Sequence, residues 1–215
     1  MSEFFDEIAS KLYDGEYELM PVLVQQGLDA GLMPVDIMQN GLIAGMDHIG
    51  ADFKSGELFV PEVLIAARAM TAGMNILRPL IGESGTSSAG KYVIGTVKGD
   101  IHDIGKNLVK MLLEGAGFET VDLGCDVSPE TFVEAVKEHH PWLVGMSAML
   151  TTTMISMGET MELLDAEGLL EDVKVMIGGA PVTSGYAQTI GADAYAPDAA
   201  SAVDIARSLI EGSGK

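Results

Sequence analysis

The sequence predicts an all-α N-terminal domain followed by an α/β domain built on a doubly wound, five-stranded parallel sheet. Up to about residue 81, apolar residues recur at helical spacing. From residue 91 onward, short apolar runs alternate with amphipathic stretches, a pattern typical of a parallel sheet covered by helices. Between these parts, the segment GESGTSSAG is small and polar and has nothing to bury. We therefore expect domains at residues 1–81 and 91–215, joined by a linker at 82–90.

The N-terminal half has the pattern of a four-helix unit. Pro34 and Pro61 suit the first turn of a helix, where the missing N–H costs nothing, whereas Pro21 leaves the start of the second helix open. Glycines suit helix ends, and three stand at such positions: Gly27, Gly31 and Gly56. The apolar positions that would form the buried faces are Phe4, Ile8 and Leu12, then Met38, Leu42, Met46, Ile49 and Phe53, then Val63, Ala67, Met70, Met74 and Leu77.

The C-terminal half predicts five strands alternating with five helices, a Rossmann-like or flavodoxin-like arrangement. In such sheets ligands bind beyond the carboxyl ends of the strands, where the strand order reverses. Three loops therefore need attention: KGDIHDIG at 98–105, MSAMLTTT at 146–153 and GGAPVTSG at 178–185. The expected strands are 91–97, 119–124, 142–147, 173–179 and 193–196, and the expected helices begin near residues 105, 129, 154, 183 and 198.

Composition excludes several classes of protein. With 32 acidic and 12 basic residues, the net charge of −20 would repel a nucleic acid backbone. The N-terminus has no signal-peptide pattern, and no run reaches the roughly 18 apolar residues that span a bilayer, so we expect a soluble cytoplasmic protein with no membrane partner. The single cysteine, Cys125, excludes an internal disulfide and a cysteine-rich metal site.

His102 stands in the loop after the first expected strand, between Asp100 and Asp103. One interpretation is a solvent-exposed or capping histidine, with the aspartates at the start of the next helix. The other is a metal ligand whose second ring nitrogen is held by the Asp100 carboxylate. The spacing of the histidine and the aspartates does not by itself distinguish these two interpretations. The loop lacks the phosphate-binding glycine patterns, and one histidine with scattered carboxylates does not make a zinc site.

The next two loops carry hydroxyl groups and glycines. Four hydroxyl residues at the end of the third strand exceed what one helix cap needs: Ser147, Thr151, Thr152 and Thr153. Gly178 and Gly179 end the fourth strand, and suit either an ordinary turn or the close approach of a flat or extended ligand.

These loops together resemble the signature of cobalamin-binding domains. Residues 52–70 also resemble the helical cap that precedes this domain in cobalamin-dependent methionine synthase. Overall, nearly the whole chain resembles the small corrinoid proteins of anaerobic methyltransferase systems that use methanol, methylamines, betaines or methoxylated aromatics. The matching positions are Asp100, His102 and Gly105 in the pattern DxHxxG, Ser147 and Met149 in an SxL-like position, and the pair Gly178 and Gly179.

The resemblance implies a cofactor and its ligands. Cobalamin would bind with its dimethylbenzimidazole tail withdrawn from cobalt and buried in the sheet crevice, and His102 would replace it as the lower axial ligand. Asp100 and Thr153, where the family often has serine, would complete a proton relay with His102 that couples axial ligation to the methylation state. Other cofactor contacts implied are Gln39, Phe53, Val60 and Val63 in the cap, Gly99, Ile101, Asp103, Ile104 and Gly105 in the first loop, and Ser147, Met149, Leu150, Thr151, Gly178, Gly179 and Ala199 around the tail.

The function that the resemblance implies is that of a methyl carrier. A donor-specific methyltransferase would load a methyl group onto cobalt, a second would pass it to a thiol or to tetrahydrofolate, and a reductive activation protein would restore the cofactor. Alternatives are the B12 subunit of an adenosylcobalamin mutase, which would lack this cap, and a cobalamin-dependent regulator, which would need a basic DNA-binding module that the sequence does not show. A cofactor-free interaction protein would leave the combination of loop motifs as coincidence.

Overall fold

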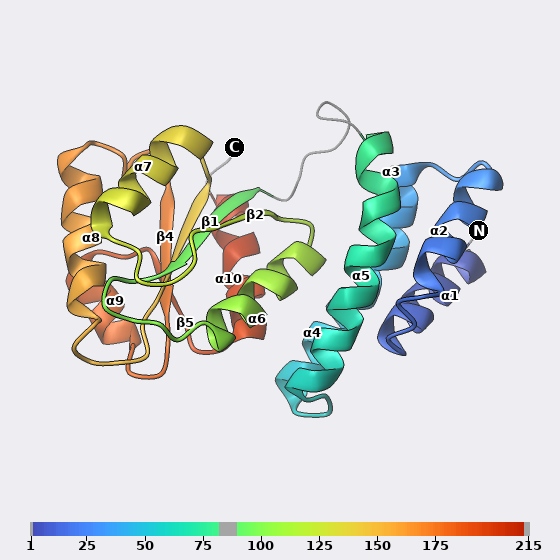
Figure 1. Cartoon of the computed structure of the whole chain (residues 1–215), viewed down its shortest axis with the longest axis horizontal. Helices are drawn as coiled ribbons and strands as arrows, with labels where there is room; N and C mark the ends of the chain where they lie inside the picture. Colours follow the sequence, from blue (N-terminus) through green and yellow to red (C-terminus); the bar gives the residue numbers. More distant parts are fainter. Residues whose placement is uncertain (1, 82–89, 213–215) are drawn as a thin grey trace. The chain divides into compact units, whose positions relative to one another are not determined.

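The structure, a computed structural model, describes residues 2–81 and 90–212. These residues form two compact units, one made of helices and one built on a parallel sheet (Figure 1). The predicted linker at 82–90 lies outside the described residues except for Gly90.

The helical unit consists of four helices, as predicted. One of the four is made of three consecutive segments that run without a break from residue 34 to residue 55, and the middle segment is π-helical. Within the unit, α1 packs against η1 and α4, and α2 packs against α5. The segments are α1 (Ser2–Tyr13), α2 (Met20–Asp29), α3 (Pro34–Asp36), η1 (Ile37–Ile43), α4 (Ala44–Ser55) and α5 (Val60–Ile81).

Prolines and glycines set most of the helix ends. Pro34 and Pro61 lie in the first turns of α3 and α5, and Pro21 does the same for α2, which settles where the second helix begins. Gly56 ends α4 in the left-handed conformation with a φ of 83°. The prediction that Gly27 ends a helix is wrong, because it lies inside α2, where an added Cβ would come within 2.8 Å of the Phe4 ring. Close packing of α1 on α2, not a helix end, explains this glycine.

The second unit is the predicted doubly wound sheet. Its strands are all parallel and follow the order β2-β1-β3-β4-β5. Helices α7, α8 and α9 cover one face and α6 and α10 the other (Figure 1). The elements are β1 (Lys91–Thr96), α6 (Ile104–Gly115), β2 (Glu119–Asp122), α7 (Pro129–His139), β3 (Leu143–Ser147), α8 (Ile155–Ala166), β4 (Lys174–Gly178), α9 (Ser184–Ile190), β5 (Ala194–Ala196) and α10 (Ala199–Gly212).

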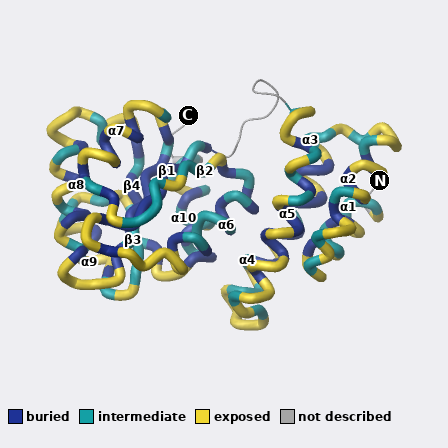
Figure 2. The backbone as a smooth tube through the Cα atoms, viewed as in Figure 1, coloured by how far each residue is buried: buried dark blue, intermediate teal, exposed yellow. Residues whose placement is uncertain are grey.

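Apolar strands hold this sheet between its helices, and Figure 2 shows its central strands as buried. On one face, Val93, Val144 and Val175 stand side by side in neighbouring strands and pack with Phe132 of α7 and Met157 of α8. Because both faces are covered, the chain leaves the carboxyl ends of the strands as the place for a ligand.

Among the described helices, α5 is long and apolar enough to cross a membrane, judged by length and composition only. Seven of its residues are buried in the structure, which is the pattern of a core helix. They are Val63, Ala66, Ala67, Ala69, Met70, Gly73 and Leu77.

Candidate functional site

The candidate site lies where the strand order reverses. The chain leaves β1 toward β2 on one side and returns to β3 on the other, so the loops after β1 and β3 stand next to each other at the carboxyl edge. The first loop carries Asp100 and His102, and the second carries Met149 and Thr153. Hydrogen bonds join these four residues, so the structure brings together the motif residues that sequence analysis singled out.

The Asp100 carboxylate is the centre of this site. It is 1% exposed, and its Oδ1 accepts hydrogen bonds from the His102 backbone N–H at 3.0 Å and from His102 Nδ1 at 2.7 Å. Its Oδ2 accepts from the Met149 N–H and from the Thr153 hydroxyl, both at 2.7 Å. Burial raises the pKa of this carboxyl group, but the bonds from Met149, Thr153 and His102 lower it by more. The pKa of Asp100 therefore lies well below the ordinary aspartate value, and the group is ionised.

The His102 ring is held at one nitrogen and open at the other. Because the ionised Asp100 can only accept, Nδ1 carries the hydrogen and the lone pair lies on Nε2. No described residue hydrogen-bonds Nε2, and the side chain is 52% exposed. The buried Thr96 hydroxyl donates to the His102 backbone carbonyl at 2.9 Å, so the main chain is fixed as well. This is the arrangement of a metal-ligating imidazole oriented by a carboxylate.

Exposed apolar side chains accompany this open nitrogen in the same two loops. Ile101 is 79% exposed, Ile104 78%, Met149 48% and Leu150 44%. Exposed apolar side chains of this kind are typical of a surface that a ligand or partner covers. Within residues 2–81 and 90–212, no group of three His, Cys, Asp or Glu side chains could hold a metal ion.

Thr153 links the carboxylate to the start of α8. Its hydroxyl oxygen lies 2.7 Å from Asp100 Oδ2 and 2.9 Å from the Leu150 carbonyl oxygen, and its single hydrogen can serve one acceptor at a time. The charged carboxylate is the stronger acceptor, so the hydrogen points to Asp100 while that group is ionised.

Replacing Thr153 by valine, which has the same shape without the hydroxyl, is expected to lower the free energy of unfolding by about 1–2 kcal/mol. The pKa of Asp100 should rise in this variant, because a bond that favours the ionised form is lost. Urea unfolding near neutral pH measures the first effect. Thr153→Ser keeps the hydroxyl and serves as the matched control, and equal losses in both variants would contradict the role of the hydrogen bond.

The hydroxyl and glycine positions meet at the same edge. Ser147, half-buried at the end of β3, pairs in register with Gly178 at the end of β4. Gly179 has a φ of 125°, and a Cβ there would lie 1.9 Å from the Ala148 carbonyl oxygen, so close packing of the two loops requires glycine. Thr151 is exposed in the turn before α8.

Other predicted contacts lie at the starts of helices. Asp103 immediately precedes α6, and Ala199 is the buried first residue of α10. Gly105 is exposed, and a Cβ added there would meet no protein atom within 4 Å, so the packing of the chain does not require a glycine here. Gly99 has a φ of 82° and belongs to the same loop as His102.

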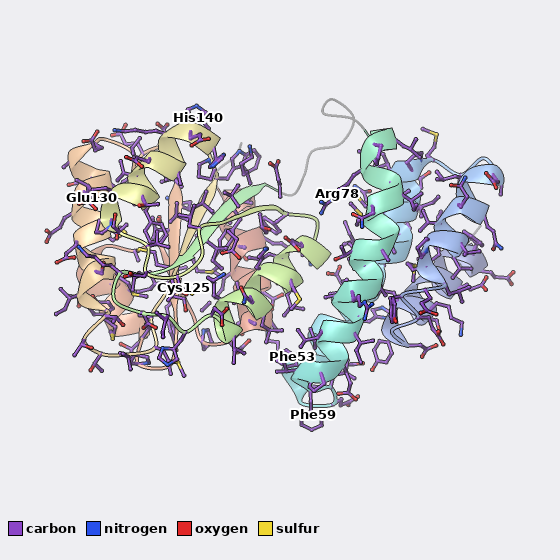
Figure 3. The ribbon with its side chains drawn as sticks, in the orientation of Figure 1. Phe53, Phe59, Arg78, Cys125, Glu130 and His140 are labelled. Carbon is purple, nitrogen blue, oxygen red and sulfur yellow. The ribbon has the colours of Figure 1, made fainter. Side chains whose placement is uncertain are left out.

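In the helical unit, the predicted cap residues differ in exposure. Gln39 is exposed in η1, whereas Phe53 in α4 and Val60 at the start of α5 are half-buried. Val63 is fully buried, so its side chain belongs to the core and offers no surface to a ligand. Phe53 lies at the same end of the unit as Phe59, by the turn between α4 and α5, and Phe59 is 67% exposed (Figure 3). Sequence analysis missed Phe59, although an aromatic residue just before a helix start was a usable signal.

Two further residues of the site were missed. Thr96 is a hydroxyl residue at the end of an otherwise apolar strand, and its contact with His102 gives it a place in the site. Asp126 follows β2, and its Oδ1 accepts the Gly99 N–H at 2.7 Å. Thr96 is a polar residue at a strand end, which is a signal that could have identified it, whereas Asp126 lies four residues beyond the end of β2.

Comparison with known proteins agrees with this geometry. Residues 90–204 match a family described as B12 binding domain, and residues 5–78 match a second family with the same description. The chain belongs to the B12-binding protein family. Both units of this B12-binding protein are thus accounted for, the sheet unit by the first match and the helical unit by the second.

Relatives of this B12-binding protein are similar over most of their length. Dimethylamine corrinoid protein 1 of Methanosarcina acetivorans is 49% identical over 83% of this chain and 84% of the relative. A corrinoid protein of Desulfitobacterium hafniense is 41% identical over 95% of this chain and 96% of its own.

Solved structures show the same fold. The methanol:cobalamin methyltransferase complex of Methanosarcina barkeri matches with a TM-score of 0.89 and 31% identity, over 98% of this chain and 80% of that one. A cobalamin-binding protein of Desulfitobacterium hafniense matches with a TM-score of 0.78 and 35% identity, over 95% and 98%.

Proposed function

We propose that this B12-binding protein carries a corrinoid and shuttles methyl groups between two methyltransferases. The observation that carries the proposal is the His102 imidazole, whose Nε2 is open while the buried Asp100 holds Nδ1 at 2.7 Å. Relatives named for dimethylamine and trimethylamine, and a structural neighbour named as a methanol:cobalamin methyltransferase complex, support the methyl-carrier role.

The residues of the site fit a corrinoid bound in the base-off, histidine-on form. His102 would hold cobalt through Nε2, and the exposed Ile101, Ile104, Met149 and Leu150 would cover the ring that surrounds the metal. A corrin ring supplies the ligands that the protein does not. Gly105 would leave its edge free, which explains a glycine that protein packing does not require.

The tail of the cofactor would lie at the carboxyl ends of β3 and β4. Ser147 and Gly178 stand side by side there, Gly179 follows, and Thr151 offers an exposed hydroxyl nearby in the β3–α8 loop. Asp103 and Gly99 belong to the His102 loop and Ala199 to the start of α10, and we keep them as proposed contacts.

Bound cobalamin supplies a cobalt centre that accepts a methyl group from one partner and releases it to another. The residues around His102 determine which of its ring nitrogens carries the hydrogen. Asp100 keeps the hydrogen on His102 Nδ1, so Nε2 remains a donor of its lone pair. Thr153 stabilises the charge of Asp100 through Oδ2. His102, Asp100 and Thr153 would thus form a proton relay, in which Nε2, when it holds no metal, would take up a proton and Asp100 would pair with the imidazolium.

The helical unit supplies further proposed contacts of the cofactor. Gln39, Phe53 and Val60 are the proposed contacts, and Phe59 joins them because it is exposed at the same end as Phe53 (Figure 3). Val63 is not proposed, because it is fully buried.

The proposal requires partners. These are a donor-specific methyltransferase, a methyltransferase that passes the group to a thiol or to tetrahydrofolate, and a protein that reductively reactivates the cofactor. We place this system in the cytoplasm. A mutase subunit or a regulator is less well supported, because the relatives whose similarity spans both units are named as corrinoid proteins, one of them for trimethylamine.

The experiment that tests the function uses the full chain, loaded anaerobically with hydroxocobalamin and reduced. It is mixed with the candidate methyltransferase from the same organism and, in turn, with monomethylamine, dimethylamine, trimethylamine, methanol or betaine. We expect one class of donor to produce the visible spectrum of a methylated corrinoid, and a thiol-dependent second enzyme to discharge it. A corrinoid that binds stoichiometrically but is methylated by none of these donors would contradict the proposal.

A further inference from the structure

We infer that Asp126, in the loop between β2 and α7, is a positioning residue that fixes the backbone of Asp100 and thereby the direction of the His102 side chain. The inference rests on the proposed role of His102 and extends it to a residue outside the DxHxxG motif. The loop runs from the end of β2 past Cys125 to α7, whose first turn carries Glu130 (Figure 3).

Asp126 forms two hydrogen bonds with the His102 loop. Its Oδ1 accepts the Gly99 N–H at 2.7 Å, and its own N–H donates to the Asp100 carbonyl oxygen at 2.9 Å. The two bonds fall on consecutive residues and lie on either side of the peptide that joins them. The Gly99 N–H belongs to the peptide before this one and the Asp100 carbonyl to the peptide after it, so one residue of the neighbouring loop holds the main chain at two points just before the histidine.

These two bonds to the main chain complement the bonds to the Asp100 side chain. The carboxylate is held from the β3 side by the Met149 N–H and the Thr153 hydroxyl. The main chain of the same residue is held from the β2 side by Asp126. The Asp100 N–H also donates to the Val97 carbonyl at 3.1 Å, and Thr96 holds the His102 carbonyl. Asp126 adds to these bonds and further limits the directions that the His102 ring can take.

The backbone conformation shows that this placement is enforced. Asp126 has a φ of 55°, a left-handed conformation that is uncommon for residues other than glycine. Its neighbours keep it there: the Val127 N–H donates to the Thr96 carbonyl at 3.0 Å, and the Thr96 N–H donates to the Gly124 carbonyl at 2.9 Å. Strain of this kind persists where the surrounding structure over-determines it, often at functional sites.

The base of the loop is anchored by an ion pair between Asp122 and the buried Lys106. Asp122 Oδ1 accepts from Lys106 Nζ at 2.6 Å and from the Gly124 N–H at 3.0 Å, and the Lys106 side chain is only 2% exposed. Because Lys106 lies in the first turns of α6, the helix that follows His102 is tied to the loop that carries Asp126. This ion pair therefore helps to hold the loop that carries Asp126 in place.

Three variants separate the hydrogen bond from the strain. Asp126→Asn keeps an acceptor oxygen, Asp126→Ala removes it and leaves the left-handed φ, and Asp126→Gly removes it while relieving the φ. Asp165→Asn, an exposed aspartate of α8, is the control for charge. In the cofactor-free protein, we expect exchange of the Gly99 amide hydrogen, followed by NMR, to accelerate about tenfold in the alanine and glycine variants.

The second readout uses the same variants loaded with cobalamin. The equilibrium between histidine-ligated and unligated cofactor, followed by visible spectroscopy over a range of pH, should shift about fivefold toward the unligated form in the alanine and glycine variants. Asp126→Asn and Asp165→Asn should stay near the wild type. A purely structural role would leave the ligation profile of every folded variant unchanged.

Two results would overturn the inference. One is an unchanged Gly99 exchange rate in Asp126→Gly, and the other is faster exchange with an unchanged ligation profile. Failure of the proposed function is recognised separately, because His102→Ala would then leave the cobalamin spectrum unaltered in an otherwise wild-type background.

Discussion

His102→Ala is expected to leave the protein folded and able to bind cobalamin, but to change its visible spectrum and to lower methyl transfer by at least about tenfold. The spectrum should change because cobalt loses the nitrogen that Nε2 provides. The fold should survive because the side chain is 52% exposed, and the loss of its bond to Asp100 costs only about 1 kcal/mol.

The measurement compares spectra of the wild type and the variant loaded with the same cobalamin. His48→Ala, which removes an exposed histidine of α4, is the matched control and should keep the wild-type spectrum. Addition of imidazole to His102→Ala should restore part of the original spectrum, since the vacated position can take a free ligand. A spectrum that His102→Ala does not alter would show that the histidine does not coordinate cobalt.

Asp100→Asn is expected to have the largest effect on stability of any substitution in the site, about 2–4 kcal/mol in the free energy of unfolding at neutral pH. The carboxylate is 1% exposed and accepts four hydrogen bonds, and an amide in its place offers one acceptor atom and turns N–H groups toward donors. In the loaded protein, the loss of the Nδ1 partner should also weaken ligation by about 10- to 100-fold.

The stability effect should depend on pH in a defined direction. The pKa of Asp100 is lowered in the folded protein, so its contribution is fully present above the unfolded-state pKa of about 4 and is lost as the pH falls toward the folded value. The difference between wild type and Asp100→Asn should therefore be constant near neutrality and shrink below about pH 4. Urea unfolding at a series of pH values tests this, with Asp165→Asn as control; a difference that does not shrink in acid would rule out the charge as its source.

Much of the fold was predictable because local patterns dictate it. The alternation of buried runs with amphipathic stretches placed the five strands, and prolines such as Pro34 and Pro61 marked helix starts. The π-helical turn of η1 and the role of Gly27 were not predictable. The role of Gly27 depends on how segments far apart in the chain pack, since an added Cβ there would meet the Phe4 ring.

In the candidate site, too, some contacts could be predicted from the sequence and others could not. Asp100 and His102 are two residues apart, so their contact could be anticipated from spacing. The Thr153 contact came from the family resemblance, because it joins loops that are 53 residues apart. Asp126 could not be found, since no local pattern indicates that a residue after β2 would hold Gly99. Val63 is fully buried, and helical periodicity does not distinguish a core position from a covered binding face.

The central claim is that the His102 imidazole is the lower axial ligand of cobalt. Its most direct test is electron paramagnetic resonance of the protein loaded with cobalamin and reduced to Co(II), prepared with natural-abundance histidine and with ¹⁵N-histidine. The account predicts that the splitting from the axial nitrogen changes its multiplicity on labelling, and that His102→Ala abolishes this change. A splitting that is the same in both preparations would show that the nitrogen comes from the cofactor's own tail, and would contradict the account.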